Sequence, residues 1–187
     1  DGMLRAITPN TRLVYVNNPN NPSGQPIAKD AIRQVARAAG HALVFVDEAY
    51  QDFLGENFLE EASQYPNVLI GRTFSKAFGL AGMRVGVMIA SPAVLAPIRK
   101  VMPLFNLNVV AVAALRAAIA DPSFRTWYMA QAEEARQIVD AMISKGVFVR
   151  DRTKDPSTAT CFRITTGVVE HTRKAAETLE AVCASLR

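Results

Sequence analysis

Short apolar runs that end in polar residues constrain the fold of this chain more than any other feature. Such runs lie at residues 13–16, 42–46 and 68–72, and their length and apolar content are typical of short buried strands. Between the first two, residues 27–39 repeat apolar side chains at helical spacing and stop at Gly40, which predicts a helix. A strand–helix–strand unit of this kind has a right-handed crossover.

Polar side chains gather where two of the predicted strands end. The first strand runs into Asn-Asn-Pro-Asn-Asn-Pro-Ser-Gly at residues 17–24, and the second ends at Asp47, with Tyr50 three residues later. In open parallel sheets, ligands bind beyond the carboxyl ends of the strands. The sequence therefore predicts a ligand site at this edge of the sheet.

Lys76 lies in a loop of mostly small and hydroxylated residues between predicted strands at 68–72 and 85–90. Loops of this kind carry functional sites. A lysine amine that is held out of bulk water near other cations becomes a nucleophile and can form a Schiff base with a carbonyl compound. Thr73, Ser75 and Arg84 offer hydroxyls and a guanidinium to a phosphate, so the neighbourhood suits an aldehyde that carries a phosphate.

The three polar segments resemble, in letters, order and spacing, the motifs of the fold-type I aminotransferases of class I/II, which use pyridoxal 5′-phosphate (PLP). The motifs are Asn-Pro-Asn-Asn-Pro-Ser-Gly, Asp-Glu-Ala-Tyr, and Ser-Lys-Ala-Phe-Gly with an arginine eight positions after the lysine. Residues 146–151 and 161–167 resemble the histidinol-phosphate aminotransferase branch. The resemblance implies an α/β fold: a mostly parallel sheet flanked by helices in an α/β/α large domain, with part of a small α+β C-terminal domain.

The resemblance also implies a role for each residue of the cofactor site. Lys76 would form a Schiff base with PLP and later move the proton at the substrate Cα. Asp47 would pair with the pyridine nitrogen and keep it protonated, so that the ring can take up electrons. The remaining cofactor contacts would be Asn21 and Tyr50 to the phenolic oxygen, and Thr73, Ser75 and Arg84 to the phosphate.

For the substrate, the resemblance implies transfer of an amino group from histidinol phosphate to a 2-oxo acid such as 2-oxoglutarate. Arg163 would bind the anionic group of the substrate, with Arg150 as a second contact. An aromatic amino-acid aminotransferase or a threonine-phosphate decarboxylase would share all the cofactor motifs. An alternative from another class is a non-enzymatic, PLP-sensing domain such as those of certain transcription regulators, although no helix-turn-helix segment is evident.

Taken singly, these residues have purely structural interpretations. Asp47 could cap a helix, Lys76 could be a solvated surface charge, and Tyr50 could belong to the core. Arg84 and Arg163 could each join an ion pair, as could Arg150 with the neighbouring Asp151. Independent turns, caps and ion pairs have no reason to reproduce the whole ordered set, so the joint occurrence favours the site.

Composition and charge argue against other classes of function. Half of the residues are hydrophobic and 20% are charged, as in ordinary α/β proteins. No apolar run approaches the length of a membrane span, and no signal peptide is visible, so we expect a cytoplasmic protein. The two cysteines and two histidines lack metal-ligand spacing, which predicts no metal site. The net charge of +4 is not concentrated in a basic run, which disfavours nucleic acid as a partner.

Two parts of the chain are expected from the resemblance. Residues 1–120 would form the central part of the large PLP-binding domain, and residues 121–187 a connecting helix and a partial small domain, with an apparent internal loss near 142–146. The N-terminal part of the family fold, which carries a phosphate turn and a ring-stacking aromatic, is not recognised in the sequence. Helices are expected at 109–120, 124–142 and 170–186, and Ser91-Pro92 is expected to cap another helix. A homodimer is implied by the resemblance alone.

Overall fold

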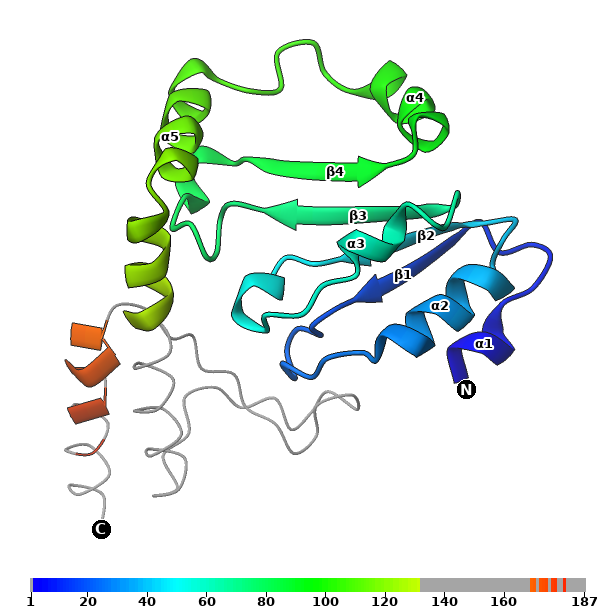
Figure 1. Ribbon diagram of the computed structural model, residues 1–187, viewed down its shortest axis with the longest axis horizontal. Helices are drawn as coiled ribbons and strands as arrows, with labels where there is room; N and C mark the ends of the chain where they lie inside the picture. Colours follow the sequence, from blue (N-terminus) through cyan, green and yellow to red (C-terminus); the bar gives the residue numbers. More distant parts are fainter. Residues whose placement is uncertain (1, 132–168, 171, 175, 178–179, 181–187) are drawn as a thin grey trace. The chain divides into compact units, whose positions relative to one another are not determined.

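The structure is a computed structural model that describes residues 2–131, 169–170, 172–174, 176–177 and 180 (Figure 1). The chain separates into two compact units, Asp1–Ala120 and Asp121–Arg187. The assignment of these parts to a large and a small aminotransferase domain stays a prediction. In the second unit, residues 122–131 are helical, as are the described positions between 169 and 180.

A four-stranded sheet organises the first unit, in the order β1 (Leu13–Asn17), β2 (Leu43–Asp47), β3 (Val68–Thr73) and β4 (Gly86–Ala90). The first three strands are parallel, which confirms the predicted mostly parallel sheet. β4 runs antiparallel to β3, because the connection between them contains only a 3₁₀ turn, η2 (Ala81–Met83), and no crossover helix.

Helices precede, connect or follow the strands: α1 (Gly2–Ala6), α2 (Lys29–Ala38), η1 (Gln51–Phe53), α3 (Leu59–Ala62), α4 (Pro92–Val101) and α5 (Val109–Ala120). α5 matches its predicted bounds. α4 begins after Ser91, whose Oγ accepts a hydrogen bond from the Val94 N–H at 3.4 Å, as the predicted cap requires. α2 begins two residues later than predicted, because Ala28 has an extended backbone, with a ψ of 136°, and its carbonyl accepts the first helical hydrogen bond, from the Ile32 N–H at 3.3 Å. The Ile27 N–H, outside the helix, donates to Asn18 Oδ1 at 2.8 Å.

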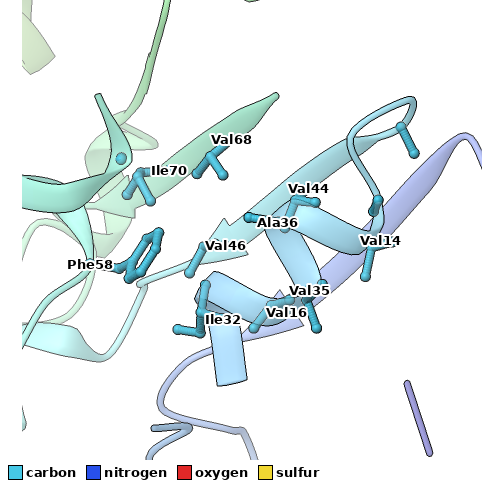
Figure 2. Packing of buried hydrophobic residues seen from close by; sticks show 13 residues of the cluster. Val14, Val16, Ile32, Val35, Ala36, Val44, Val46, Phe58, Val68 and Ile70 are labelled. Atoms are coloured by element: carbon cyan, nitrogen blue, oxygen red, sulfur yellow. The ribbon is translucent and has the colours of Figure 1, made fainter. Parts of the chain in front are cut away.

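One face of the sheet is closed by apolar packing (Figure 2). Alternate residues of β1 to β3 point into this core, and Ile32, Val35 and Ala36 of α2 pack onto them, with Phe58 at the side of β3. The strand residues are Val14, Val16, Val44, Val46, Val68 and Ile70. Burial of each such side chain contributes roughly 1.5–3 kcal/mol relative to exposure, so this face holds the unit together. We call it the packed face.

The intervening residues of the same strands form the opposite face, which we call the open face. On this face Leu13 and Tyr15 of β1 are 54% and 49% exposed, and Met88 of the adjacent β4 is 52% exposed, whereas Leu69 of β3 is buried. The Phe45 ring lies where a Cβ at position 71 would sit, since such an atom would be 2.6 Å from the ring. Gly71 therefore allows an aromatic side chain to lie flat across the sheet close to its carboxyl edge.

Across the described ranges, no helix combines the length and apolar character that a membrane span requires.

Candidate active site

The carboxyl ends of the three parallel strands meet at one edge of the sheet. Asn17 of β1 is in register with Asp47 of β2, and Asp47 is in register with Gly71 of β3. Thr73, the last residue of β3, pairs with Gly86 at the start of β4. The predicted site residues Asn21, Asp47, Tyr50, Thr73, Ser75, Lys76 and Arg84 all belong to these strand ends or to the loops that join them.

Both side-chain oxygens of Asp47 already have a donor. Oδ2 accepts a hydrogen bond from the Tyr15 hydroxyl, and Oδ1 accepts one from the Ala49 N–H at 3.0 Å. The hydrogen bond from the Tyr15 hydroxyl to Asp47 raises the pKa of Tyr15 to about 12, with smaller contributions from burial and from the carboxylate charge. The phenol therefore stays protonated at neutral pH and remains the donor.

The turn after Asp47 brings Tyr50 to Lys76. Oδ1 of Asp47 caps this turn, which continues as the short η1 and not as a long helix. The Lys76 Nζ lies over the Tyr50 ring, 5.0 Å from its centroid, and both side chains are half-buried. Their segments are far apart in sequence, so the fold joins two of the predicted motifs at this point.

The loop that carries Lys76 is fixed at both ends. The Phe74 N–H donates to the Val85 carbonyl at 3.1 Å, and the Gly79 N–H donates to the Lys76 carbonyl at 3.0 Å. Gly79 has a φ of 65°, a conformation that glycine adopts without strain. The lysine therefore projects from an ordered turn.

The three predicted phosphate contacts lie on the two sides of that loop. The Thr73 hydroxyl accepts a hydrogen bond from the Ser75 N–H at 3.1 Å and donates to the Val85 carbonyl at 3.4 Å. Arg84 is exposed and adopts a left-handed backbone conformation with a φ of 56°. Its Nη1 donates to the Ala81 carbonyl at 3.2 Å.

The loop after β1 forms the predicted turn. The Gly24 N–H donates to the Asn20 carbonyl and the Asn20 side chain donates to Ser23 Oγ, each at 2.7 Å. Asn21 is exposed within this turn. Its predicted contact with the phenolic oxygen of PLP stays a prediction, as do the roles assigned to the other site residues.

The two predicted substrate contacts, Arg150 and Arg163, lie outside the described residues. Within the described part of the chain, no three His, Cys, Asp or Glu side chains are grouped closely enough to hold a metal ion.

Sequence reasoning missed an ion pair next to the site. Glu48 is 1% exposed, and its Oε2 accepts hydrogen bonds from Arg72 Nε at 2.9 Å and Nη2 at 2.7 Å. The other oxygen, Oε1, accepts one from the Phe58 N–H at 2.6 Å. Glu48 follows Asp47 and Arg72 precedes Thr73, so this pair ties together the ends of β2 and β3. Strand alternation puts Arg72 on the opposite side of the sheet from Thr73, but it cannot indicate that Glu48 is its partner.

The chain is similar to known aminotransferases in sequence and in structure. The sequence profile of the family described as aminotransferase class I and II matches residues 1–143. The chain is 45% identical to histidinol-phosphate aminotransferase 2 of Ralstonia nicotianae over 66% of this chain and 34% of that protein. It is 35% identical to histidinol-phosphate aminotransferase of Methanococcoides burtonii over 93% of this chain and 56% of that protein.

Solved structures of aminotransferases are also similar to this chain. Histidinol-phosphate aminotransferase from Sinorhizobium meliloti, in complex with pyridoxal 5′-phosphate, superposes with a TM-score of 0.74 at 29% identity, covering 95% of this chain and 59% of that one. An aspartate aminotransferase double mutant from Thermus thermophilus superposes with a TM-score of 0.66 at 26% identity, covering 75% of this chain and 38% of that one. The chain thus spans less than two thirds of the length of each of these proteins.

Proposed function

Since this chain belongs to the class I and II aminotransferase family, we propose that the carboxyl edge of its sheet binds PLP. We propose further that the whole protein moves an amino group between an amino donor and a 2-oxo acid. The observation that carries the proposal is the contact of Lys76 with Tyr50 at the edge where Asp47 ends the neighbouring strand. These side chains are the amine, the phenol and the carboxylate that the chemistry of PLP needs.

The donor set of the site fits this cofactor. PLP carries its phenolic oxygen and its aldehyde on adjacent ring carbons, and here a phenol and a lysine amine lie side by side. The ring nitrogen lies opposite the aldehyde carbon and needs an anionic partner. Asp47, at the end of β2 beside β3, is available for this role. The phosphate needs hydroxyl and guanidinium donors, which Thr73, Ser75 and Arg84 would supply.

When bound, PLP supplies an electron sink for the carbanion formed at the substrate Cα. The protein groups would each support one part of this chemistry. Asp47 would hold a proton at the ring nitrogen, because a carboxylate stabilises the charged form of its partner. Tyr50 would donate a hydrogen bond to the phenolic oxygen. Lys76 would supply the amine that joins the aldehyde and, once released, would carry the proton to and from the substrate Cα.

Histidinol phosphate is the amino donor that we propose, with 2-oxoglutarate as the acceptor. The support is the 45% and 35% identity to two histidinol-phosphate aminotransferases. Histidinol phosphate carries a phosphate and no carboxylate, whereas glutamate, formed from 2-oxoglutarate, carries two carboxylates. Arg163 and Arg150 would bind the phosphate as two guanidinium forks, whereas one fork is enough for a carboxylate. The protein would act as a homodimer, in the cytoplasm.

Steady-state kinetics of the full-length protein with both amino donors test this proposal. Arg163→Lys should impair turnover of histidinol phosphate and of glutamate, whereas Arg150→Ala should raise KM selectively for histidinol phosphate. Arg37→Ala, on an exposed position of α2, serves as the control and should change neither. Full-length protein with bound PLP that turns over neither donor would refute the proposed activity. Equal effects of Arg150→Ala on both donors would refute the assignment of the substrate.

A further inference from the structure

The hydrogen bond from Tyr15 to Asp47 has no part in the function proposed so far. We propose that Tyr15 is a positioning residue, which fixes the carboxylate of Asp47 in the orientation that the ring nitrogen of the cofactor requires. This inference rests on the proposed function, because it assumes that Asp47 is the partner of that nitrogen. It adds a residue from the middle of β1 to a site otherwise built from the ends of the strands and the loops that follow them.

The strand register places Tyr15 for this role. Tyr15 is in register with Phe45, and Asn17 is in register with Asp47, so Tyr15 and Asp47 are diagonal neighbours on the open face. Diagonal neighbours lie within reach of long aromatic side chains. The Tyr15 hydroxyl spans this diagonal and donates to Asp47 Oδ2.

The second carboxylate oxygen is also held. Oδ1 accepts from the Ala49 N–H at 3.0 Å, so a donor from the middle of β1 and a donor from the turn after β2 fix the two oxygens and prevent the carboxylate from rotating. A carboxylate has about four lone-pair positions. Two donors therefore leave room for a third, which is the N–H of a protonated pyridine ring.

The tyrosine ring is itself anchored. Tyr15 packs edge-on against Phe45, with ring centroids 5.2 Å apart and planes at 72°. Phe45 in turn occupies the space that the missing Cβ of Gly71 leaves open. The position of the Tyr15 hydroxyl thus depends on β1, β2 and β3 together, although half of the side chain is exposed.

The raised pKa of Tyr15, about 12, agrees with this role, since the hydroxyl keeps its proton over the whole range in which an aminotransferase would work. A donor that lost its proton within this range would make the hydrogen bond to Asp47 depend on pH. Tyr15 keeps its proton and therefore remains the donor throughout. Its removal should release Oδ2 and let the carboxylate rotate away from the ring nitrogen.

The test compares Tyr15→Phe with Tyr65→Phe in the full-length protein. Tyr65 packs against Phe58 on the packed side, with centroids 5.8 Å apart, and serves as the matched control. Three quantities are measured: the dissociation constant of PLP, the pH midpoint of the visible absorbance of the bound cofactor, and the urea midpoint. Because water can replace a half-exposed hydroxyl, we expect roughly three- to tenfold weaker PLP binding for Tyr15→Phe.

The absorbance midpoint should shift in the same variant, while its urea midpoint stays close to that of the unsubstituted protein. A purely structural role would leave the absorbance midpoint of the folded variant unchanged. Tyr65→Phe should alter neither PLP binding nor absorbance. In addition, Tyr15→Phe should have little further effect on PLP binding when Asp47→Ala is already present, because the two residues act through one hydrogen bond.

Normal PLP binding and an unshifted absorbance in Tyr15→Phe would overturn the inference and leave the proposed function intact. An equal loss of PLP binding in the presence and absence of Asp47→Ala would also overturn it. Failure of the unsubstituted full-length protein to bind PLP would overturn the proposed function, and this inference with it.

Discussion

The two faces of the sheet are built from alternate residues of the same strands, yet they serve different ends. On the packed face, Val46 and Ile70 are fully buried beneath the layer that includes α2. On the open face, Tyr15 and Asp47 form a polar contact at the carboxyl edge. A shift of one residue along a strand therefore changes the expected effect of a substitution, from loss of folding free energy to loss of ligand binding.

At the carboxyl edge of the sheet the same contrast holds between adjacent residues, one serving folding stability and the next serving the proposed ligand binding. The buried carboxylate of Glu48 forms an ion pair with the partly exposed Arg72, whereas the neighbouring residues Asp47 and Thr73 are proposed to face the cofactor. The ion pair satisfies both carboxylate oxygens of Glu48 together with the Phe58 N–H. Its proposed task is to hold the ends of β2 and β3 at a fixed spacing.

The largest effect on chemistry is expected for Asp47→Ala in the full-length protein. The variant should lose on the order of 3–5 kcal/mol of transition-state stabilisation, which is a loss in rate of at least about a hundredfold, because the ring nitrogen loses its anionic partner. PLP retention should suffer less, since the phosphate contacts survive. Single-turnover kinetics with a good amino donor measure the rate. A near-normal rate would mean that Asp47 only caps a turn.

Arg72→Met should cause the largest loss of folding stability. It leaves the buried carboxylate of Glu48 without its cation, which costs roughly 3–5 kcal/mol, and urea unfolding measures the change. Arg33→Met is the matched control: Arg33 pairs with Glu61 through Nε at 2.7 Å, but both side chains are more exposed than those of the Glu48–Arg72 pair. The control should lose much less. Equal losses in the two variants would contradict the structural role of the edge pair.

Ile70→Ala tests the packed face directly. Ile70 is 0% exposed, and removal of its side chain should cost roughly 2–4 kcal/mol through lost burial and a residual cavity. Met88→Ala, on the open face, should cost less than about 1 kcal/mol, because that side chain is half-exposed. Urea midpoints of the two variants make the comparison. Similar losses would show that the open face is as well covered as the packed one in the full-length protein.

The smallest effect concerns pH. Hydrogen bonds from Arg33, and the charges of Arg33 and Lys29, lower the pKa of Glu61 below its ordinary value of 4.5. A lowered folded-state pKa stabilises the fold above the ordinary value, and this stabilisation is lost as the pH falls through the folded-state value. The difference in urea midpoint between the unsubstituted protein and Glu61→Gln should therefore shrink between about pH 7 and about pH 3. A difference that stays constant over this range would contradict the assignment of the pair.

The sequence predicted those features that local patterns encode. The apolar runs predicted the strands, the Ser91-Pro92 pair predicted the start of α4, and the alanine-rich segment predicted α5. The start of α2 was predicted too early, because Ala28 has an extended backbone, with a ψ of 136°, and its carbonyl accepts the first helical hydrogen bond. The apolar spacing continues to Ile27 and does not show where the backbone enters the helical conformation.

Partnerships between distant residues could not be predicted from the sequence. Tyr15 and Asp47 are 32 positions apart, and Glu48 and Arg72 are 24 apart. Strand alternation indicates which face each residue occupies, but the register between strands decides which residues meet. The antiparallel direction of β4 follows from the compact turn around Lys76, and no residue pattern in β4 itself encodes it.

The central claim is that the carboxyl edge of this sheet binds PLP with Lys76 as the residue that joins it. The most direct measurement is borohydride reduction of the full-length protein purified with PLP, followed by peptide mapping. We expect a single pyridoxyl group, on Lys76, in the peptide that contains Ser-Lys-Ala-Phe-Gly. A pyridoxyl group on a different lysine, or none in protein that retains PLP, would contradict the claim.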